Sequence, residues 1–150
     1  MSIVSAIKAI LEADATLAAA ATGGIWDWDE TGRLGLNLTN TPTAFDGNGI
    51  IRPAIMVKLR SSIPDYDLAD DDGQYVSLRH NVEVWIYQDT GYTTIETMRY
   101  RVYTLLHTKR VANEGVFQML WQGDIRGNRD TEIDANVERS DYLVRARRSV

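Results

Sequence analysis

The stretch that decides the fold is Val76-Ser-Leu-Arg-His-Asn-Val-Glu-Val-Trp-Ile-Tyr87. Its residues alternate between two faces, as the side chains of a β-strand do. The mostly apolar face carries Val76, Leu78, His80, Val82, Val84 and Ile86. The opposite face carries Ser77, Arg79, Asn81, Glu83, Trp85 and Tyr87. This pattern predicts a long strand over 76–87 with one side in the core.

A helix is predicted after this strand, over 93–109. Thr93 and Glu96 have the spacing of a capping box, so the helix is expected to begin at Thr93. Its core stripe, expected to pack on a sheet, is Ile95, Met98, Val102, Leu105 and Leu106.

Three further alternating segments, 54–60, 116–126 and 137–147, complete the predicted main sheet. No helical pattern joins 54–60 to 76–87, which predicts an antiparallel pair. In 116–126 the alternation places Phe117, Met119, Trp121 and Ile125 on one face. The predicted fold class is α+β: a mostly antiparallel sheet with a helix packed on it and an N-terminal helix, as a single domain over 1–150.

The N-terminal part contributes short elements and a long loop. A helix over 2–12 with Ser2 as its cap and a turn over 15–21 capped by Asp14 are predicted. The N-terminal helix is also a candidate cover for Trp85 and Tyr87. A short strand follows at 25–29, and then a loop over 30–53, a length that is usually functional or mobile. Within it, Asp46-Gly-Asn-Gly49 predicts the tip of a small hairpin.

Composition limits the classes of function. The chain has 44% hydrophobic and 25% charged residues, which is typical of a soluble globular protein. No run of eighteen apolar residues predicts a membrane span, and no signal peptide is expected. The absence of cysteine excludes disulfides, thiolate nucleophiles and zinc–thiolate sites. A net charge of −5 disfavours a general nucleic-acid binder, so no sequence-specific nucleic-acid partner is expected.

The acidic loop over 61–74 resembles a calcium loop only in composition. It contains Asp65, Asp67, Asp70, Asp71 and Asp72, followed by Gly73. If Gly73 were the sixth residue of an EF-hand loop, the twelfth would be Arg79 where glutamate is required. An exposed hairpin tip, solvated or facing a basic partner, is therefore favoured.

The residues of other chemical sites do not have the spacing that a reaction needs. His80 is expected in the core with a hydrogen bond, and His107 near the end of the helix. The sequence has no nucleophile elbow and no glycine-rich phosphate loop. We therefore expect no catalytic, metal or cofactor-binding residues, and a protein that is not an enzyme.

A second stripe on the 93–109 helix indicates a surface with a partner. It consists of Glu96, Tyr100, Tyr103 and His107, and either a second layer of the same chain or another subunit could cover it. The arginines of the last strand favour edge-strand protection and ion pairs. The predicted subunit or partner interface residues are Asp70, Asp71, Asp72, Trp85, Tyr100, Tyr103, Arg139, Arg145 and Arg147.

The order of several segments resembles one protein family. These segments are Ile3-Val-Ser-Ala-Ile-Lys-Ala-Ile-Leu-Glu-Ala-Asp-Ala-Thr-Leu17, Gly24-Ile-Trp-Asp27, Arg52-Pro-Ala-Ile-Met-Val57, Arg79-His-Asn-Val-Glu-Val-Trp-Ile-Tyr87, Tyr100-Arg-Val-Tyr-Thr-Leu-Leu-His107 and the strands 116–126 and 137–147. In order and spacing they are similar to the tail terminator (tail-completion) proteins of long-tailed bacteriophages. The loop over 30–53 departs from the compact members of that family.

The resemblance implies a structural virion protein at the head-proximal end of the tail, made in the host cytoplasm. It implies a homo-hexameric ring that caps the tail-tube protein, ends tube polymerisation and presents a surface to the head–neck connector protein, with a lumen through which DNA can pass. It implies no membrane partner and no cofactor. A head–tail connector or neck protein is the alternative, and a small hydrolase using carboxylates such as Glu83 or Asp124 is a more distant one.

Overall fold

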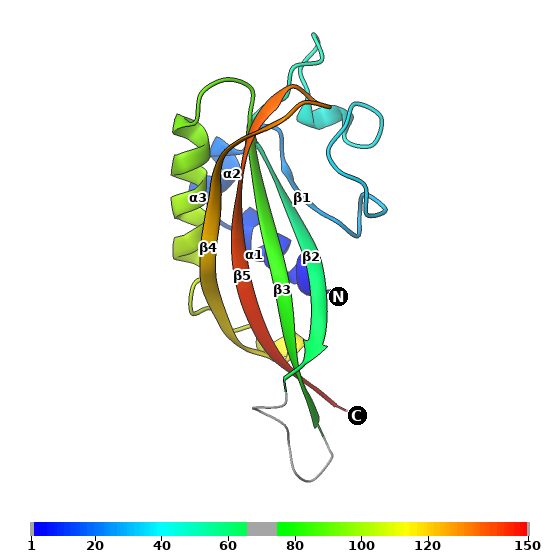
Figure 1. The fold of residues 1–150 in the computed structure, drawn as a ribbon, viewed down its shortest axis with the longest axis vertical. Helices are drawn as coiled ribbons and strands as arrows, with labels where there is room; N and C mark the ends of the chain where they lie inside the picture. Colours follow the sequence, from blue (N-terminus) through cyan, green and yellow to red (C-terminus); the bar gives the residue numbers. More distant parts are fainter. Residues whose placement is uncertain (1, 66–74, 150) are drawn as a thin grey trace.

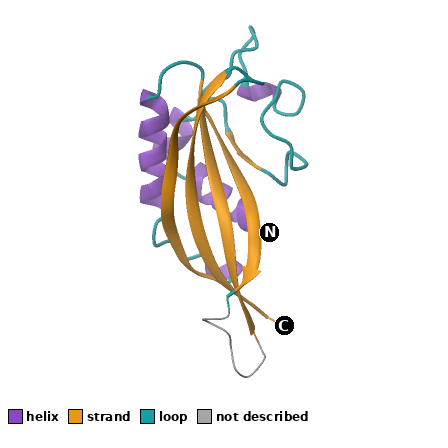
Figure 2. Ribbon diagram, in the orientation of Figure 1, coloured by secondary structure: helices purple, strands orange, loops and turns teal. Residues whose placement is uncertain are grey.

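A five-stranded mixed sheet with three α-helices on one face forms the fold (Figures 1 and 2). The computed structural model describes residues 2–65 and 75–149. The strand order is β1-β2-β3-β5-β4. The elements are α1 (Ile3–Glu12), α2 (Ala15–Ala20), β1 (Ile25–Asp27), η1 (Pro42–Ala44), β2 (Ala54–Pro64), β3 (Tyr75–Gln88), α3 (Thr93–Leu106), η3 (Ala112–Glu114), β4 (Val116–Asp130) and β5 (Ala135–Ser149).

The predicted antiparallel sheet and the α+β class are confirmed. The strand predicted over 76–87 is β3, which pairs antiparallel with β2 on one side and with β5 on the other. β5 also pairs antiparallel with β4. The short strand β1 adds a parallel edge through Ile25–Asp27, so the sheet is mixed. Strands β2, β3, β4 and β5 are longer than the alternating pattern predicted. Backbone pairing continues in them where side chains are no longer buried.

The main core lies between the helices and one face of the sheet. Alternating residues of β2, β3 and β5 face the helices, including Val57, Val84 and Val144, which are fully buried. α3 covers them with the predicted stripe Ile95, Met98, Val102 and Leu106, and Leu105 is partly buried at its side. α1 adds Val4, Ile7 and Leu11.

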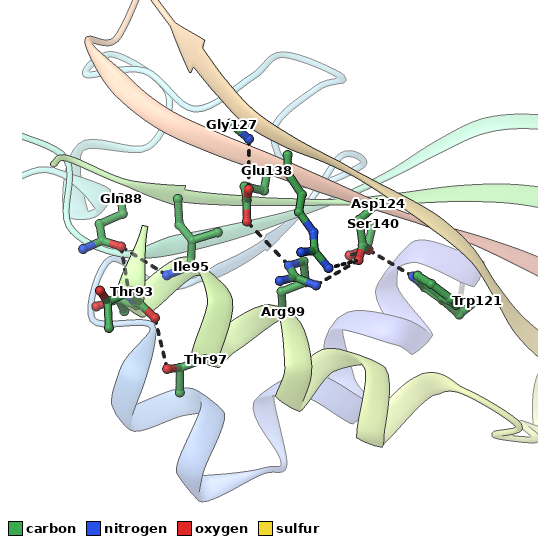
Figure 3. A network of polar contacts seen from close by, with 12 residues as sticks. Gln88, Thr93, Ile95, Thr97, Arg99, Trp121, Asp124, Gly127, Glu138 and Ser140 are labelled. Carbon is green, nitrogen blue, oxygen red and sulfur yellow. Dashed lines mark hydrogen bonds and ion pairs between the residues drawn. The ribbon is translucent and has the colours of Figure 1, made fainter. Parts of the chain in front are cut away.

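The two N-terminal caps are as predicted, but the cap of α3 is not. Ser2 forms a capping box with Ser5, and the Asp14 carboxylate accepts from the Leu17 N–H. At α3 the N-cap position is Tyr92, whose side chain makes no capping hydrogen bond. Instead, the Gln88 side-chain oxygen at the end of β3 accepts from the Thr94 and Ile95 N–H groups, at 3.1 Å each (Figure 3). The Thr93–Glu96 capping box was therefore wrong, because a residue before the loop satisfies the free helix donors.

The loop between β1 and β2, residues 28–53, packs on the face of the sheet opposite the helices. Leu36, Ala44, Phe45 and Ile51 are buried against a second cluster from the sheet, which comprises Ala54, Met56, Tyr87, Ala135 and Val137. Trp26 and Trp85 are partly buried against the same cluster. The N-terminal helix lies on the other face, so the idea that it covers Trp85 and Tyr87 was wrong; this loop is the covering layer.

We call residues 28–53 the apolar loop. Two hydrogen-bonded features fix its shape. Asp46 and Ile50 close the predicted small hairpin through a backbone bond of 2.8 Å, beside a bridge between Phe45 and Ile51. The Asn37 carboxamide oxygen accepts from the N–H groups of Thr39 and Asn40. The loop therefore has a packed core and fixed turns of its own.

The acidic loop is described only at its first aspartate. Asp65 is buried and lies 3.2 Å from the Arg145 side chain and 3.7 Å from that of Arg79. The prediction of an exposed segment was therefore wrong for Asp65, because two arginines of neighbouring strands neutralise it. Asp67, Asp70, Asp71 and Asp72 lie outside the described residues.

β4 is the edge strand opposite β1, and β5 lies inside the sheet. The pairing of β4 with β5 shifts register at three places, between Val116 and Gln118, Trp121 and Gly123, and Ile125 and Asn128. Such bulges bend an edge strand and hinder pairing with other chains. The suggested role of the β5 arginines in edge protection was therefore wrong, since β5 has a partner on each side.

Candidate functional site

A buried charge network joins α3 to β4 and β5 (Figure 3). Arg99 projects from α3 and its guanidinium lies 2.9 Å from the Asp124 carboxylate of β4 and 3.5 Å from the Glu138 carboxylate of β5. The Gly127 N–H donates to Glu138 at 2.9 Å. One cation therefore bridges two buried carboxylates, which fixes the helix on the outer half of the sheet.

Asp124 is the most heavily bonded member of the network. Its Oδ1 atom accepts from the Ser140 hydroxyl at 2.6 Å and from the Trp121 indole N–H at 3.0 Å. Burial alone would raise the pKa of Asp124, but these hydrogen bonds and the charge of Arg99 outweigh it and lower the pKa below its ordinary value. Asp124 is therefore held as a carboxylate.

Three aromatic residues lie beside this network, and we call Tyr100, Tyr103 and Trp121 the aromatic patch; Trp121 is joined to the network through its bond to Asp124. Tyr103 stacks on His107 with ring centroids 4.9 Å apart, and Trp121 meets Tyr103 edge-on at 5.8 Å. The Trp121 backbone N–H also donates to His107 Nδ1 at 3.1 Å. Tyr100 is 71% exposed, and Tyr103 and Trp121 are also exposed. The stripe predicted on this helix is therefore not covered by the rest of the described chain.

A small cavity opens at the aromatic patch. Its volume is about 210 Å³, and its walls are the three aromatic residues together with Arg99, Asp124 and Arg126. The charged walls pair with one another, since Arg99 and Arg126 lie 2.9 Å and 3.6 Å from the same Asp124 oxygen. The surface left without a partner is therefore aromatic.

Three of the other predicted interface residues, Trp85, Arg139 and Arg145, make contacts inside the chain. Arg139 lies 3.2 Å from Glu83 and 2.9 Å from Asp141 on the face opposite the helices. Trp85 is partly buried, and the Lys58 ammonium and the Arg139 guanidinium lie 4.5 Å and 5.6 Å from the centroid of its ring. Arg145 pairs with Asp65. The structure thus separates these residues from the aromatic patch on the other face.

Arg147 is the exception among the predicted arginines, because it is exposed and stacks over Phe117. Asp70, Asp71 and Asp72 lie outside the described residues. Among the described members of the predicted interface set, the structure brings together two separate pairs: Tyr100 and Tyr103 on the helix face, and Trp85 and Arg139 on the opposite face.

The two carboxylates considered for hydrolysis are both neutralised by arginine. Glu83 pairs with Arg139, and Asp124 with Arg99. A general acid needs a raised pKa to hold its proton near neutrality, whereas the pKa of Asp124 is lowered. This arrangement suits a structural pair better than an acid–base pair.

The two histidines have different surroundings, since His107 stacks on Tyr103 and His80 lies in the core. His80 is buried, its Nδ1 atom lies 2.7 Å from the Ser62 hydroxyl, and burial lowers its pKa. This confirms the prediction of a hydrogen-bonded core histidine.

Over residues 2–65 and 75–149, no group of three potential metal ligands is brought together. In the same ranges, every helix is too short or too polar to cross a bilayer.

Sequence reasoning missed two surface features. Trp121 was assigned to the same face as Ile125, but the bulge at Gly123 turns Trp121 towards α3 while Ile125 pairs opposite Arg139. The exposure of Leu34, Leu38 and Ile50 in the apolar loop was not predicted. Counting the apolar residues of this mostly polar loop would have drawn attention to these three.

A groove lies between α1 and the end of α3. It has a volume of about 510 Å³ and is lined mainly by Ala6, Ala9, Ile10, Leu105 and Val111. Its walls are mostly apolar and small. It is distinct from the charge network and the aromatic patch.

Comparison with known proteins reveals a likeness of fold. No protein family model matches the chain. No curated protein sequence matches it either. Among solved structures, the chain is similar to a protein of the virion of a native gene transfer agent particle, with a TM-score of 0.59 and 18% sequence identity. The match covers 100% of both chains. At this identity the likeness shows that the two chains share a fold.

Proposed function

We propose that this protein is a structural component of a phage-like virion, and that it forms a ring at the head-proximal end of the tail. In this role it resembles a tail terminator: a homo-hexamer that binds the last ring of the tail-tube protein, ends polymerisation of the tube and presents its other side to the head–neck connector protein. The lumen of the ring passes DNA.

The observation that carries this proposal is the likeness to a virion protein over the whole of both chains. A match that includes the helices, the sheet and the connections is more informative than a shared sheet, because common supersecondary units recur in unrelated proteins. The ordered sequence resemblance to tail terminators is a separate line of support, since it uses residues and not coordinates.

The surface chemistry agrees with an assembling protein. The aromatic patch exposes tyrosine and tryptophan side chains, which are enriched at the centres of subunit interfaces. The charged residues beside it are paired within the chain, so burial of the patch would not strand a charge. The patch can therefore be covered by another protein at low cost.

Native mass spectrometry and electron microscopy together test the proposal. The expected results are a six-fold oligomer, alone or on addition of the purified tail-tube protein, and tubes of limited length with a ring at one end. A protein that stays monomeric with and without the tube protein would contradict the ring. A ring that binds isolated heads or connectors, and leaves tube growth unchanged, would favour the neck-protein alternative.

A further inference from the structure

Much of one face of the sheet has no cover in the part of the chain that the structure describes. The helices pack on the other face, and the apolar loop packs on the end of this face around Tyr87 and Val137. Figure 1 shows the remaining strands in front of the helices, and we call their uncovered side the open face. One solvated face is ordinary for an antiparallel sheet, so its composition decides whether it has a further role.

The strand register shows that the side chains of the open face form one surface. From one end to the other, the cross-strand pairs of β3 and β5 on this face are Trp85–Arg139, Glu83–Asp141, Asn81–Leu143, Arg79–Arg145 and Ser77–Arg147. Side chains directly opposite each other on antiparallel strands have Cβ atoms about 4.5–5.5 Å apart. On the outer strands, Lys58 lies opposite Glu83, and Gln118 lies opposite Arg145. The open face is therefore continuous across four strands.

The open face carries more positive than negative charge. Its described cations are Lys58, Arg60, Arg79, Arg139, Arg145 and Arg147. The carboxylates that pair with them or act on them are Asp65, Glu83, Asp130 and Asp141. Six cations against four carboxylates leave an excess of two positive charges after every ion pair is counted, in a chain whose net charge is −5.

The excess lies at the end of the open face that is remote from the apolar loop. Arg79 and Arg145 stand directly opposite each other on β3 and β5 and share the Asp65 carboxylate, at 3.7 Å and 3.2 Å. Like charges in this position repel each other. Arg147, further along β5, is exposed and stacks over the Phe117 ring. We call Arg79, Arg145 and Arg147 the arginine cluster, and an anion bound to it would relieve the repulsion.

A polar hollow occupies the middle of the open face. Its volume is about 310 Å³, and it is lined mainly by Arg60, Ser61, Asn81, Glu83, Gln122 and Asp141. The Arg60 side chain is 66% exposed and lies 4.0 Å from Glu83, a carboxylate that Arg139 already approaches at 3.2 Å. Polar walls favour a polar occupant over an apolar side chain, and Arg60 offers that occupant a further cation.

Phosphate groups in a row fit this arrangement better than single carboxylates do. An arginine that is already paired keeps further N–H donors in its planar fork, and these match the oxygens of a phosphate. Residues two apart on a strand are separated by roughly 6.6–6.8 Å, so Arg145 and Arg147 offer donors at successive positions, with Arg79 beside them. A DNA duplex repeats its phosphates at fixed intervals, whereas the acidic groups of a protein surface have no fixed repeat.

We propose that the open face binds the phosphate backbone of double-stranded DNA through the arginine cluster and Arg60. The contact has no sequence preference, because phosphate contacts carry no direct sequence information. In the proposed ring this face lines the lumen, so the inference rests on the proposed function and names the surface that meets the DNA. Non-specific, salt-dependent binding lets DNA slide, as passage through a ring requires.

Fluorescence anisotropy with a short labelled duplex, over a series of salt concentrations, tests the contact. The wild type should bind at low salt and lose affinity steeply as the salt concentration rises. The double variant Arg60→Gln and Arg147→Gln removes two exposed cations of the open face. Its affinity at low salt should fall on the order of tenfold, and the slope of log K against log salt should become shallower by about 2.

The matched control is the double variant Arg110→Gln and Arg126→Gln, which removes two exposed cations outside the open face. It changes the net charge by the same amount, but its affinity should stay within about threefold of the wild type, because distant charges act only through a screened field. Circular dichroism checks that both double variants are folded. Polyglutamate of equal charge serves as a competitor and should displace the duplex poorly.

The outcomes separate this inference from the proposed function. No binding by the wild type at low salt, equal weakening in the two double variants, or equally effective competition by polyglutamate would overturn the DNA contact. If native mass spectrometry still gave a ring in that case, the proposed function would stand without this surface. A protein that binds the duplex through the open face, yet stays monomeric with and without the tube protein, would support the DNA contact and contradict the ring.

Discussion

Arg99 is the single cation that bridges Asp124 and Glu138, and its removal should be costly. In Arg99→Met both carboxylates lose their main counter-ion in a site where all three side chains are at most 14% exposed. Breaking a buried ion pair from one side typically costs about 3–5 kcal/mol. We therefore expect the free energy of unfolding in urea to fall by about that amount.

The control for this experiment is Arg126→Met, which removes a second arginine from the same carboxylate. The Arg126 side chain is 60% exposed and lies 3.6 Å from Asp124, so its contribution should be about 0–1 kcal/mol. Similar losses in the two variants would show that burial does not govern this network.

The lowered pKa of Asp124 predicts a dependence of stability on pH. A carboxylate whose pKa is depressed in the folded state stabilises the fold above its ordinary pKa and loses that contribution as the pH falls through the folded value. The free energy of unfolding should therefore decrease as the pH falls below about 4. Urea titrations of wild type and Asp124→Asn should show a shallower decrease in the variant, and parallel curves would contradict the assignment.

Among the connecting elements, the turn that leads from η3 into β4 depends on a glycine. Gly115 has φ of +68°, and a Cβ atom there would lie 2.2 Å from the Arg147 carbonyl oxygen of β5. Gly127 has φ of +70° and no neighbour within 4 Å of such an atom. The pair thus separates the cost of the backbone conformation from the cost of the clash.

We expect Gly127→Ala to lower the free energy of unfolding by about 1–2 kcal/mol, the cost of a left-handed conformation for a residue with a side chain. Gly115→Ala should lose about 1–3 kcal/mol more, because the β5 backbone must also move. Thermal and urea unfolding of both variants would measure the difference. Equal losses of unfolding free energy in the two variants would mean that the β5 backbone at Arg147 shifts without measurable cost.

The elements also show which parts of the fold the sequence could predict. Strand β3 and helix α3 have unbroken periods of two and 3.6 residues; β3 includes all of the predicted 76–87, and α3 begins at Thr93 as predicted but ends at Leu106 instead of 109. The bulge at Gly123 was not predictable from alternation, because one extra residue inverts every later side chain and leaves the composition unchanged. The cap from Gln88 was also missed, since it comes from outside the helix and its first turn.

The candidate site was predictable only in part, because several of its residues are brought together by the fold of different segments. Tyr100 and Tyr103 stood out because a second stripe on one helix is visible in the sequence. Trp121 joins them through the fold of β4, and Leu38 becomes a surface feature only because the rest of its loop is buried. The ion pairs expected for the arginines of the last strand are present at Arg139 and Arg145, but the sequence could not identify the partners that other segments supply, Glu83 of β3 and Asp65 after β2.

At the scale of the whole molecule, the distribution of charge predicts an effect on assembly. The chain has a net charge of −5, so copies repel one another, yet Asp70, Asp71 and Asp72 concentrate three of the negative charges in one segment. If this segment steers a copy towards a basic surface of a neighbour or of the tube protein, neutralising it should slow assembly. If it only adds to the net repulsion, neutralising it should speed assembly.

We predict the first result for the triple variant Asp70→Asn, Asp71→Asn and Asp72→Asn. Ring formation, followed by light scattering at low salt, should be slower than in the wild type and lose most of its salt dependence, because screening acts on the same long-range attraction. The control carries Glu12→Gln, Glu132→Gln and Asp134→Asn, three exposed residues whose change alters the net charge equally. If both triple variants assemble faster to the same extent, net repulsion is the governing term and steering by the acidic segment is wrong.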